Sequence, residues 1–147
     1  MPPFLVTGAF ARRPALAAKV LVVEDHEDTR CLLRLLLEKR GFSVIEAGDG
    51  FEAMNMAERE HPDLILLDSE LPLLDGIGVT RRLRGMPELS AIPIVFLSGH
   101  AENERRAAAL DAGCDEYMVK PFDLARLDNV LTRHLPRRGS AGTRGFE

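Results

Sequence analysis

Short apolar runs alternate with longer amphipathic segments between residue 19 and about residue 135 of this chain. The apolar runs predict five β-strands, over residues 19–23, 42–47, 63–68, 92–98 and 115–119. The amphipathic segments predict five helices, over residues 27–41, 49–61, about 76–84, 101–113 and 123–135. Strand–helix units in such alternation favour an α/β fold, in which helices cover both faces of a parallel sheet.

The order of the strands in that sheet follows from general rules of chain connection. Crossovers between parallel strands are right-handed, which leaves few topologies for five strands. The leading one is the doubly wound, flavodoxin-like (βα)5 arrangement with strand order 2-1-3-4-5, counted along the chain. The strands over 63–68 and 92–98 are the most aliphatic, so they belong in the middle. In such sheets, ligands bind beyond the carboxyl ends of the strands.

The length of 147 residues suits a single domain, which we expect over residues 19–136, with a flexible extension over 1–18 and a flexible tail over 137–147. A formal net charge of −4 gives no electrostatic reason to expect a nucleic-acid partner. No stretch approaches about 18 uninterrupted apolar residues, so we expect no membrane span and a cytoplasmic location. Cys31 and Cys114 lack metal-ligand spacing and are expected to be reduced thiols.

Polar residues stand at or just after the carboxyl ends of four predicted strands. They are Glu24, Asp25, Asp68, Ser98 and Lys120. Parallel strands end at one edge of their sheet, so these side chains would project into one crevice. Taken singly, each has a structural reading: Asp68 as a turn residue, Ser98 as a helix cap, Lys120 as a counterion for Asp25 or Asp68. Three carboxylates, a hydroxyl and a lysine at one edge favour a functional site.

Each of these residue types has a chemical use at such an edge. Clustered carboxylates repel one another unless a cation joins them, and an all-oxygen site suits Mg²⁺. An aspartate can act as a nucleophile and form an aspartyl phosphate. Phosphoryl transfer needs charge neutralisation on the equatorial oxygens, and Lys120 and Ser98 fit that role. The four histidines are scattered, share no metal-ligand pattern and are expected at the surface; they are His26, His61, His100 and His134.

Four motifs, "VLVVEDH", "LILLDSELPLLDG", "FLSG" and "DEYMVKPF", make the chain resemble the receiver domain of bacterial two-component response regulators. The resemblance covers residues 19 to about 135. It implies that Asp68 is phosphorylated by a phosphohistidine on a sensor histidine kinase or a histidine phosphotransfer protein. It also implies Mg²⁺ as cofactor, bound by Glu24, Asp25, Asp68 and the backbone carbonyl of Glu70. Glu24 stands where the family often has Asp, which leaves direct and water-mediated contact with the metal both open.

The same resemblance assigns roles around the phosphoryl group. Ser98 would bond it and Lys120 would pair with it, while Tyr117 falls where the family has its aromatic switch residue. In such proteins the ring rotates inward on phosphorylation and remodels the face made by residues 101–113, 115–119 and 123–135, which would bind a downstream protein. Glu70 and His100 lie two residues after Asp68 and Ser98, at positions that in this family modulate dephosphorylation.

Four functions stay open on these residues. We expect a stand-alone response regulator of a two-component system or phosphorelay, whose only chemistry is Mg²⁺-dependent self-phosphorylation and autodephosphorylation at Asp68. A receiver cut from a larger regulator or hybrid kinase would look the same. A Mg²⁺-dependent phosphatase with Asp68 as nucleophile is less favoured, because Glu70 stands where such enzymes have a second aspartate. The full acidic, hydroxyl and lysine set argues against a receiver-like module that is never phosphorylated.

Overall fold

The structure of this protein is a computed structural model that describes residues 17–135. Residues 1–16 of the expected extension, residue 136 of the expected domain and the expected tail over 137–147 lie outside it. Its strands are β2 (Lys19–Val23), β3 (Ser43–Ala47), β4 (Leu64–Asp68), β5 (Ile94–Ser98) and β6 (Glu116–Val119). Its helices are α2 (Glu27–Lys39), α3 (Gly50–Glu60), α4 (Gly76–Arg84), α5 (Asn103–Ala112) and α6 (Leu124–His134). Each predicted strand and helix is confirmed, with small differences at its ends.

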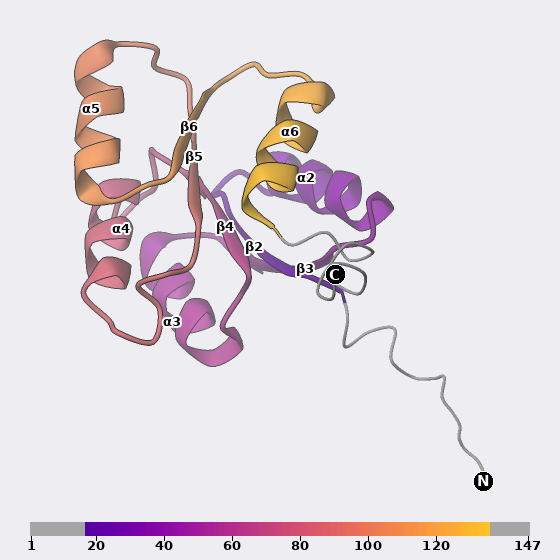
Figure 1. Cartoon of the computed structure of the whole chain (residues 1–147), viewed down its shortest axis with the longest axis horizontal. Helices are drawn as coiled ribbons and strands as arrows, with labels where there is room; N and C mark the ends of the chain where they lie inside the picture. Colours follow the sequence, from indigo (N-terminus) through magenta and orange to yellow (C-terminus); the bar gives the residue numbers. More distant parts are fainter. Residues whose placement is uncertain (1–16, 136–147) are drawn as a thin grey trace, which may run out of the picture.

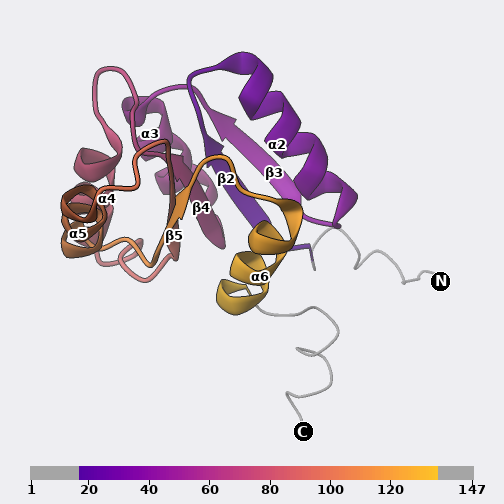
Figure 2. The ribbon, with the colours of Figure 1, turned by 90° about the horizontal axis from the view of Figure 1, so that it is seen from above.

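The five strands form one parallel sheet in the order β3-β2-β4-β5-β6. Because β2 is the first strand of the described chain, this is the predicted order 2-1-3-4-5. Helices α2 and α6 cover one face of the sheet, and α3, α4 and α5 cover the other (Figures 1 and 2). The doubly wound, flavodoxin-like fold expected from the sequence is therefore confirmed.

The central strands explain the aliphatic runs of the sequence. All residues of β4 and β5 are buried, because helices cover both of their faces. Leu64 and Leu66 pack into the apolar layer beneath α2 and α6, whereas Ile65 and Leu67 pack into the layer beneath α3, α4 and α5. Burying each such side chain stabilises the fold by roughly 1.5–3 kcal/mol. The last residue of β4 is Asp68, which lies at the edge where this core ends.

Aspartates begin three of the helices by accepting hydrogen bonds from free backbone N–H groups. Asp49, Asp75 and Asp123 accept from the N–H groups of Glu52, Gly78 and Arg126 at 2.8, 2.9 and 2.9 Å. Each such cap stabilises its helix by about 1 kcal/mol. The caps of α4 and α6 matter for function, because they fix where the loops after β4 and β6 end.

Arg84, at the end of α4, ties that helix to the far edge of the sheet. Its guanidinium donates to the carbonyl oxygens of Gly113, Ser90 and Ile92 at 2.9, 3.0 and 2.8 Å, and to the carboxylate of Asp115 at 2.9 Å. Gly113 adopts a left-handed φ of +119°, and a Cβ there would lie 2.7 Å from the Arg84 side chain. Arg84 thus joins the segment that precedes β5 to the turn that precedes β6.

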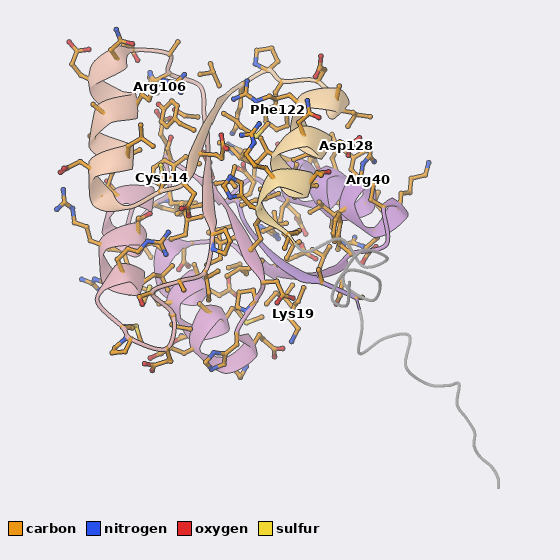
Figure 3. The ribbon with its side chains drawn as sticks, viewed as in Figure 1. Lys19, Arg40, Arg106, Cys114, Phe122 and Asp128 are labelled. Atoms are coloured by element: carbon orange, nitrogen blue, oxygen red, sulfur yellow. The ribbon has the colours of Figure 1, made fainter. Side chains whose placement is uncertain are left out.

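Contacts between side chains also join neighbouring helices. Arg40, which follows α2, donates to both carboxylate oxygens of Asp128 on α6, at 2.5 and 3.2 Å (Figure 3).

The two cysteines are free thiols: Cys31 on α2 is partly exposed, whereas Cys114 is buried and its burial raises the pKa of the thiol to about 11. None of the helices between residues 17 and 135 has the length and apolar character needed to cross a bilayer.

Candidate functional site

The carboxyl ends of the strands bring together an ion-paired cluster of three residues. Lys120 follows β6, and its Nζ lies 3.5 Å from Glu24 Oε1 and 3.6 Å from Asp68 Oδ1. Glu24 directly follows β2 and Asp68 ends β4, so the three residues come from three strands. Of the two counterions that the sequence allowed for Lys120, the described residues show Asp68, together with Glu24, rather than Asp25. The predicted crevice therefore contains these three side chains.

Asp68 is a charged residue with little access to water. Only 6 % of its surface is exposed. Burial raises the pKa of its carboxyl group, as does the nearby Glu24 carboxylate, whereas Lys120 and a hydrogen bond from the Glu70 backbone N–H at 3.3 Å act in the opposite direction. The net pKa is raised, which means that the neighbours do not fully compensate the buried charge. A cation bound beside the carboxylate would relieve this cost.

Glu24 is even more deeply buried, with 1 % exposed, and one of its oxygens lacks a hydrogen bond. Oε1 has no hydrogen-bond partner among the described residues, while Oε2 accepts from the backbone N–H of His26 at 3.1 Å. Burial alone would raise the pKa of Glu24, but the bonds from His26 and the charge of Lys120 lower it overall. Glu24 is therefore an ionised carboxylate whose buried Oε1 has no hydrogen bond and faces the Lys120 ammonium group at 3.5 Å.

His26 lies beside the two acidic residues that follow β2. Glu24, Asp25 and His26 offer ligand atoms that lie within 4.8 Å of one another. His26 Nδ1 lies 3.1 Å from Glu24 Oε2 and 3.4 Å from Asp25 Oδ1, because the chain turns directly from β2 into α2 at these residues. The ring is on the surface as expected, yet it belongs to a possible ligand group. Periodicity cannot reveal this, since the three residues are neighbours in a turn.

The acidic group has the chemistry that a hard divalent cation requires. Carboxylate oxygens predominate, one of them is buried without a hydrogen bond, and the carboxylates of Asp68 and Glu24 share one lysine. Mg²⁺ is bound in proteins by one or two carboxylates together with waters and phosphate oxygens. The residues present therefore fit Mg²⁺.

Ser98, Tyr117 and His100 form a closed set of hydrogen bonds beside this cluster. Ser98 is fully buried and accepts from the backbone N–H of His100 at 3.1 Å. The Tyr117 hydroxyl lies 2.9 Å from Ser98 Oγ and 2.8 Å from the His100 carbonyl oxygen. The tyrosine hydroxyl is oriented to donate to both of these oxygens, so Ser98 Oγ accepts from the tyrosine as well as from the His100 backbone. Ser98 is therefore held in place by two donors.

The ring of Tyr117 occupies an inward position. It is 3 % exposed, its centroid lies 6.2 Å from that of Phe96, and the Arg106 guanidinium lies 5.1 Å above it. Tyr117 also lines a pocket of about 170 Å³, together with Ser69 and Arg105. On another side it lines a groove of about 290 Å³, together with Arg106 and Phe122. One side chain therefore connects the buried serine to the surface of α5, β6 and α6. The rotation implied by the family resemblance stays a prediction.

Glu70 and His100 contact each other, which the sequence did not predict. The Glu70 carboxylate pairs with His100 Nε2, and its Oε2 lies 3.6 Å from a guanidinium nitrogen of Arg105. A signal was present in the sequence: both residues lie two positions beyond the ends of strands now seen to be adjacent, β4 and β5. The strand order alone, without side-chain geometry, could not show that they meet.

A sheet of this topology, with an acidic pair, a serine and a lysine at its carboxyl edge, defines the class of receiver domains. This chain belongs to the response regulator receiver domain family, whose model matches residues 20–132.

Among curated relatives, the transcriptional regulatory protein PrrA of Mycobacterium tuberculosis (strain ATCC 25618 / H37Rv) is 42% identical over 129 residues, covering 88% of this chain and 54% of PrrA. The alkaline phosphatase synthesis transcriptional regulatory protein PhoP of Bacillus subtilis (strain 168) is 46% identical over 119 residues, covering 78% of this chain and 49% of PhoP. The chain therefore spans about half the length of these curated relatives.

Solved structures show the same fold over nearly their whole length. The chemotaxis protein CheY4 of Vibrio cholerae superposes with a TM-score of 0.77 at 29% identity, covering 81% of this chain and 99% of CheY4. The receiver domain of sensor histidine kinase PA1611 from Pseudomonas aeruginosa PAO1 has a TM-score of 0.75 at 35% identity, covering 80% and 97%. That structure holds a magnesium ion in its active site cleft.

Proposed function

We propose that this chain is a phosphorylation-controlled signalling switch that accepts a phosphoryl group on Asp68 from a histidine kinase or a histidine phosphotransfer protein. The observation that carries the proposal is the buried Asp68 carboxylate at the end of β4, which shares Lys120 with the buried carboxylate of Glu24. An Asp68 oxygen attacks phosphorus, the P–N bond to the donor histidine breaks, and its electron pair stays on the histidine nitrogen. Water later releases inorganic phosphate and restores the carboxylate.

Each neighbouring residue has a role in this proposal. Glu24, Asp25, Asp68 and the Glu70 backbone carbonyl would hold Mg²⁺, and the magnesium in the related PA1611 receiver supports this. When bound, the ion supplies positive charge against the oxygens of the transferring group. Lys120, already beside Asp68, pairs with a phosphoryl oxygen. Ser98 donates its hydroxyl proton to another phosphoryl oxygen.

Tyr117 couples this chemistry to a protein-binding face. When Ser98 turns to the phosphoryl group, the hydrogen bond between Tyr117 and Ser98 is lost. The tyrosine ring is then held in its inward position by one contact fewer. Tyr117 also forms part of the groove between α5 and α6, so a change at the ring alters that groove. We infer that a downstream protein target binds the face made by α5, β6 and α6, in a stand-alone regulator located in the cytoplasm.

The second candidate is a receiver that forms part of a larger regulator. The relatives named as transcriptional regulatory proteins are about twice as long as the stretch they share with this chain. The switch chemistry at Asp68 is the same in this candidate, and only the output differs. The absence of a nucleic-acid partner stays a prediction of the stand-alone form.

The phosphatase alternative is disfavoured by the side chain of Glu70. That carboxylate would have to act as the acid and base for a substrate, but it is engaged by His100 and Arg105. The described chain also has no separate cap over the site, since α2 to α6 all pack on the sheet (Figure 1).

Acetyl phosphate and Mg²⁺, followed by intact mass measurement, test the proposal. We expect one phosphate adduct that Asp68→Asn abolishes. Asp63→Asn is the matched control, because Asp63 precedes the same strand at its opposite end and should leave the adduct unchanged. Failure of the wild-type protein to form the adduct would overturn the switch, and steady turnover of many phosphomonoesters would favour the phosphatase.

A further inference from the structure

We propose that the pocket of about 170 Å³ between α4 and α5 binds a small neutral aromatic molecule that carries one hydroxyl or N–H group. A molecule bound there packs against the ring of Tyr117 and so favours the inward position of that ring. The binding itself is inferred from the lining of the pocket, whereas its coupling to phosphorylation rests on the proposed function. Such a ligand would give the switch a second input beside the kinase.

The pocket lies between two neighbouring helices and the sheet beneath them. Helices α4 and α5 pack side by side on the same face of the sheet (Figures 1 and 2). Ile77 and Ala108 line the pocket from these helices, and Phe96 and Tyr117 line it from β5 and β6. Because the side chain of Ala108 is a single methyl group, α5 leaves room there that a larger residue would fill.

Two stacked rings give the pocket a preference for a flat, apolar molecule. The ring centroids of Phe96 and Tyr117 lie 6.2 Å apart with an interplanar angle of 25°, and both residues are buried. A further ring can pack on such a pair in an offset-stacked or edge-to-face contact. Apolar cavities of about 150 Å³ in other proteins bind benzene, so the volume suits one six-membered ring with a small substituent.

A serine hydroxyl supplies the polar contact. Ser69 lines the pocket, and its Oγ is buried without a hydrogen-bond partner among the described residues. The only other such side-chain atom between residues 17 and 135 is Glu24 Oε1, which faces Lys120. A buried hydroxyl without a partner costs free energy, and a ligand hydroxyl or N–H group that bonds to it removes that cost.

The charged residues of the pocket favour a ligand without net charge. Asp75 and Arg105 both line it, and they carry opposite charges. Asp75 uses one oxygen to cap α4, and Arg105 lies 3.6 Å from the Glu70 carboxylate. A cationic or an anionic molecule is attracted by one of the two lining charges and repelled by the other. A neutral molecule such as a phenol avoids this conflict.

Tyr117 connects the pocket to the phosphorylation site. Its hydroxyl lies 2.9 Å from Ser98 Oγ, and its ring forms part of the pocket lining. A ligand packed on the inward ring makes contacts that are lost when the ring leaves, so it binds the inward arrangement more tightly. By thermodynamic linkage, a phosphoryl group that favours the same arrangement strengthens the binding of the ligand.

Titrations of the full chain with 4-fluorophenol and fluorobenzene, followed by fluorine NMR of the probe, test the pocket. We expect 4-fluorophenol to bind, and Ala108→Leu to weaken its binding by about tenfold or more because the larger side chain fills the pocket. Ala107→Leu is the matched control, since Ala107 is exposed on the same helix and does not line the pocket.

A second substitution tests the polar contact. Ser69→Ala should weaken the binding of 4-fluorophenol by about fivefold, because the hydrogen bond to the hydroxyl is lost. The same substitution should leave the binding of fluorobenzene unchanged, since that probe has no group that bonds to Ser69. An equal effect on both probes would overturn the assignment of Ser69 as the polar contact.

Beryllofluoride, a phosphoryl mimic, tests the coupling. With Mg²⁺ and beryllofluoride present, the affinity for 4-fluorophenol should rise by about fivefold, and Asp68→Asn should remove this rise. An affinity that the mimic leaves unchanged would overturn the coupling to Tyr117.

The remaining outcomes separate the pocket from the proposed function. Absence of binding, or equal binding to the wild-type and Ala108→Leu proteins, would overturn the pocket, while a phosphate adduct at Asp68 would still support the switch. Binding that Ala108→Leu blocks, in a protein that forms no adduct, would support the pocket and count against the switch.

Discussion

Asp68 carries a buried negative charge that its surroundings only partly compensate. Burial and the Glu24 carboxylate raise the pKa of Asp68 above its ordinary value of 3.8, against the effect of Lys120. The folded state therefore binds this proton more tightly than the unfolded state. The stability that this proton contributes is complete below pH 3.8 and is lost as pH rises through the folded pKa. Above the folded pKa, the buried charge of Asp68 weakens the fold.

Asp68→Asn should accordingly stabilise the protein in the absence of divalent metal. The substitution removes the uncompensated charge while Lys120 keeps its pairing with Glu24. We expect the melting temperature to rise by roughly 3 °C in a chelating buffer at pH 7. Asp63→Asn removes an exposed acceptor for the Lys19 backbone N–H and should lower it slightly. A fall in melting temperature for Asp68→Asn would show that Lys120 already compensates the charge.

Single residues also show where sequence reasoning succeeded and where it stopped. Glu24, Asp68 and Lys120 could be placed together because each ends a strand, and parallel strands end at one edge. The pairing of Glu70 with His100 and the inclusion of His26 in the acidic group could not be predicted. Those contacts depend on loop conformation and side-chain torsion angles, which leave no periodic signal in the sequence.

At the scale of elements, Arg84 is the main link between α4 and the turns around β5 and β6. Arg84→Met keeps the apolar stem but leaves three carbonyl groups and Asp115 without their donor. We expect the free energy of unfolding to fall by about 3 kcal/mol, since partly buried acceptors lose a charged donor. Urea titration monitored by circular dichroism measures this loss.

The control for that substitution lies on the same helix. Arg81 is exposed, so Arg81→Met should change the free energy of unfolding by about 0.5 kcal/mol at most. Similar losses for Arg81→Met and Arg84→Met would mean that the effect comes from helix propensity or net charge rather than from the bonds to the turns.

Glu116 of β6 contacts Arg133 and His134 of α6, and this contact should make the free energy of unfolding depend on pH in the acid range. Burial alone would raise the pKa of Glu116, but hydrogen bonds from His134 and Arg133 lower it below its ordinary value of 4.5. A depressed carboxyl pKa contributes stability that is present above pH 4.5 and is lost as pH falls through the folded pKa. Glu116→Gln should therefore flatten the fall in melting temperature below pH 4.5. An unchanged pH profile would show that other carboxylates dominate acid unfolding.

The strands were predictable because those covered by helices on both faces are continuously apolar, and the helices because their apolar residues recur at the helical period. The runs "KVLVV" and "LILLD" fill β2 and β4, which helices cover on both sides. The limits of the strands shifted by a residue or two; β5, for example, begins after Pro93, which has no N–H to donate to a neighbouring strand. The Arg84 bonds were missed because they join residues up to 31 positions apart in the chain.

For the whole molecule, the two apolar layers are coupled through one sheet. Leu66 belongs to the layer under α2 and α6, and Leu67 to the layer under α3, α4 and α5, although they are consecutive in β4. Losing either layer would expose one face of the same central strands. We therefore expect a single cooperative unfolding transition.

Two probes on different parts of the fold check this cooperativity. Circular dichroism follows all the helices, whereas emission from Tyr117, the one tyrosine of a chain without tryptophan, reports the layer that contains α5. The two transitions should coincide, and Leu66→Ala and Leu67→Ala should each cost about 3 kcal/mol on both probes. Separate midpoints for the two signals would show that the layers unfold independently.

The unequal surroundings of the two cysteines have a practical consequence. Cys114 is buried with a pKa of about 11, whereas Cys31 is partly exposed on α2, on the opposite side of the sheet from α5. The thiolate is the form of cysteine that attacks a maleimide, so at neutral pH a maleimide dye should label Cys31 and spare Cys114. The natural sequence thus offers a single attachment point for a fluorophore, on a helix that takes no part in the groove beside Tyr117.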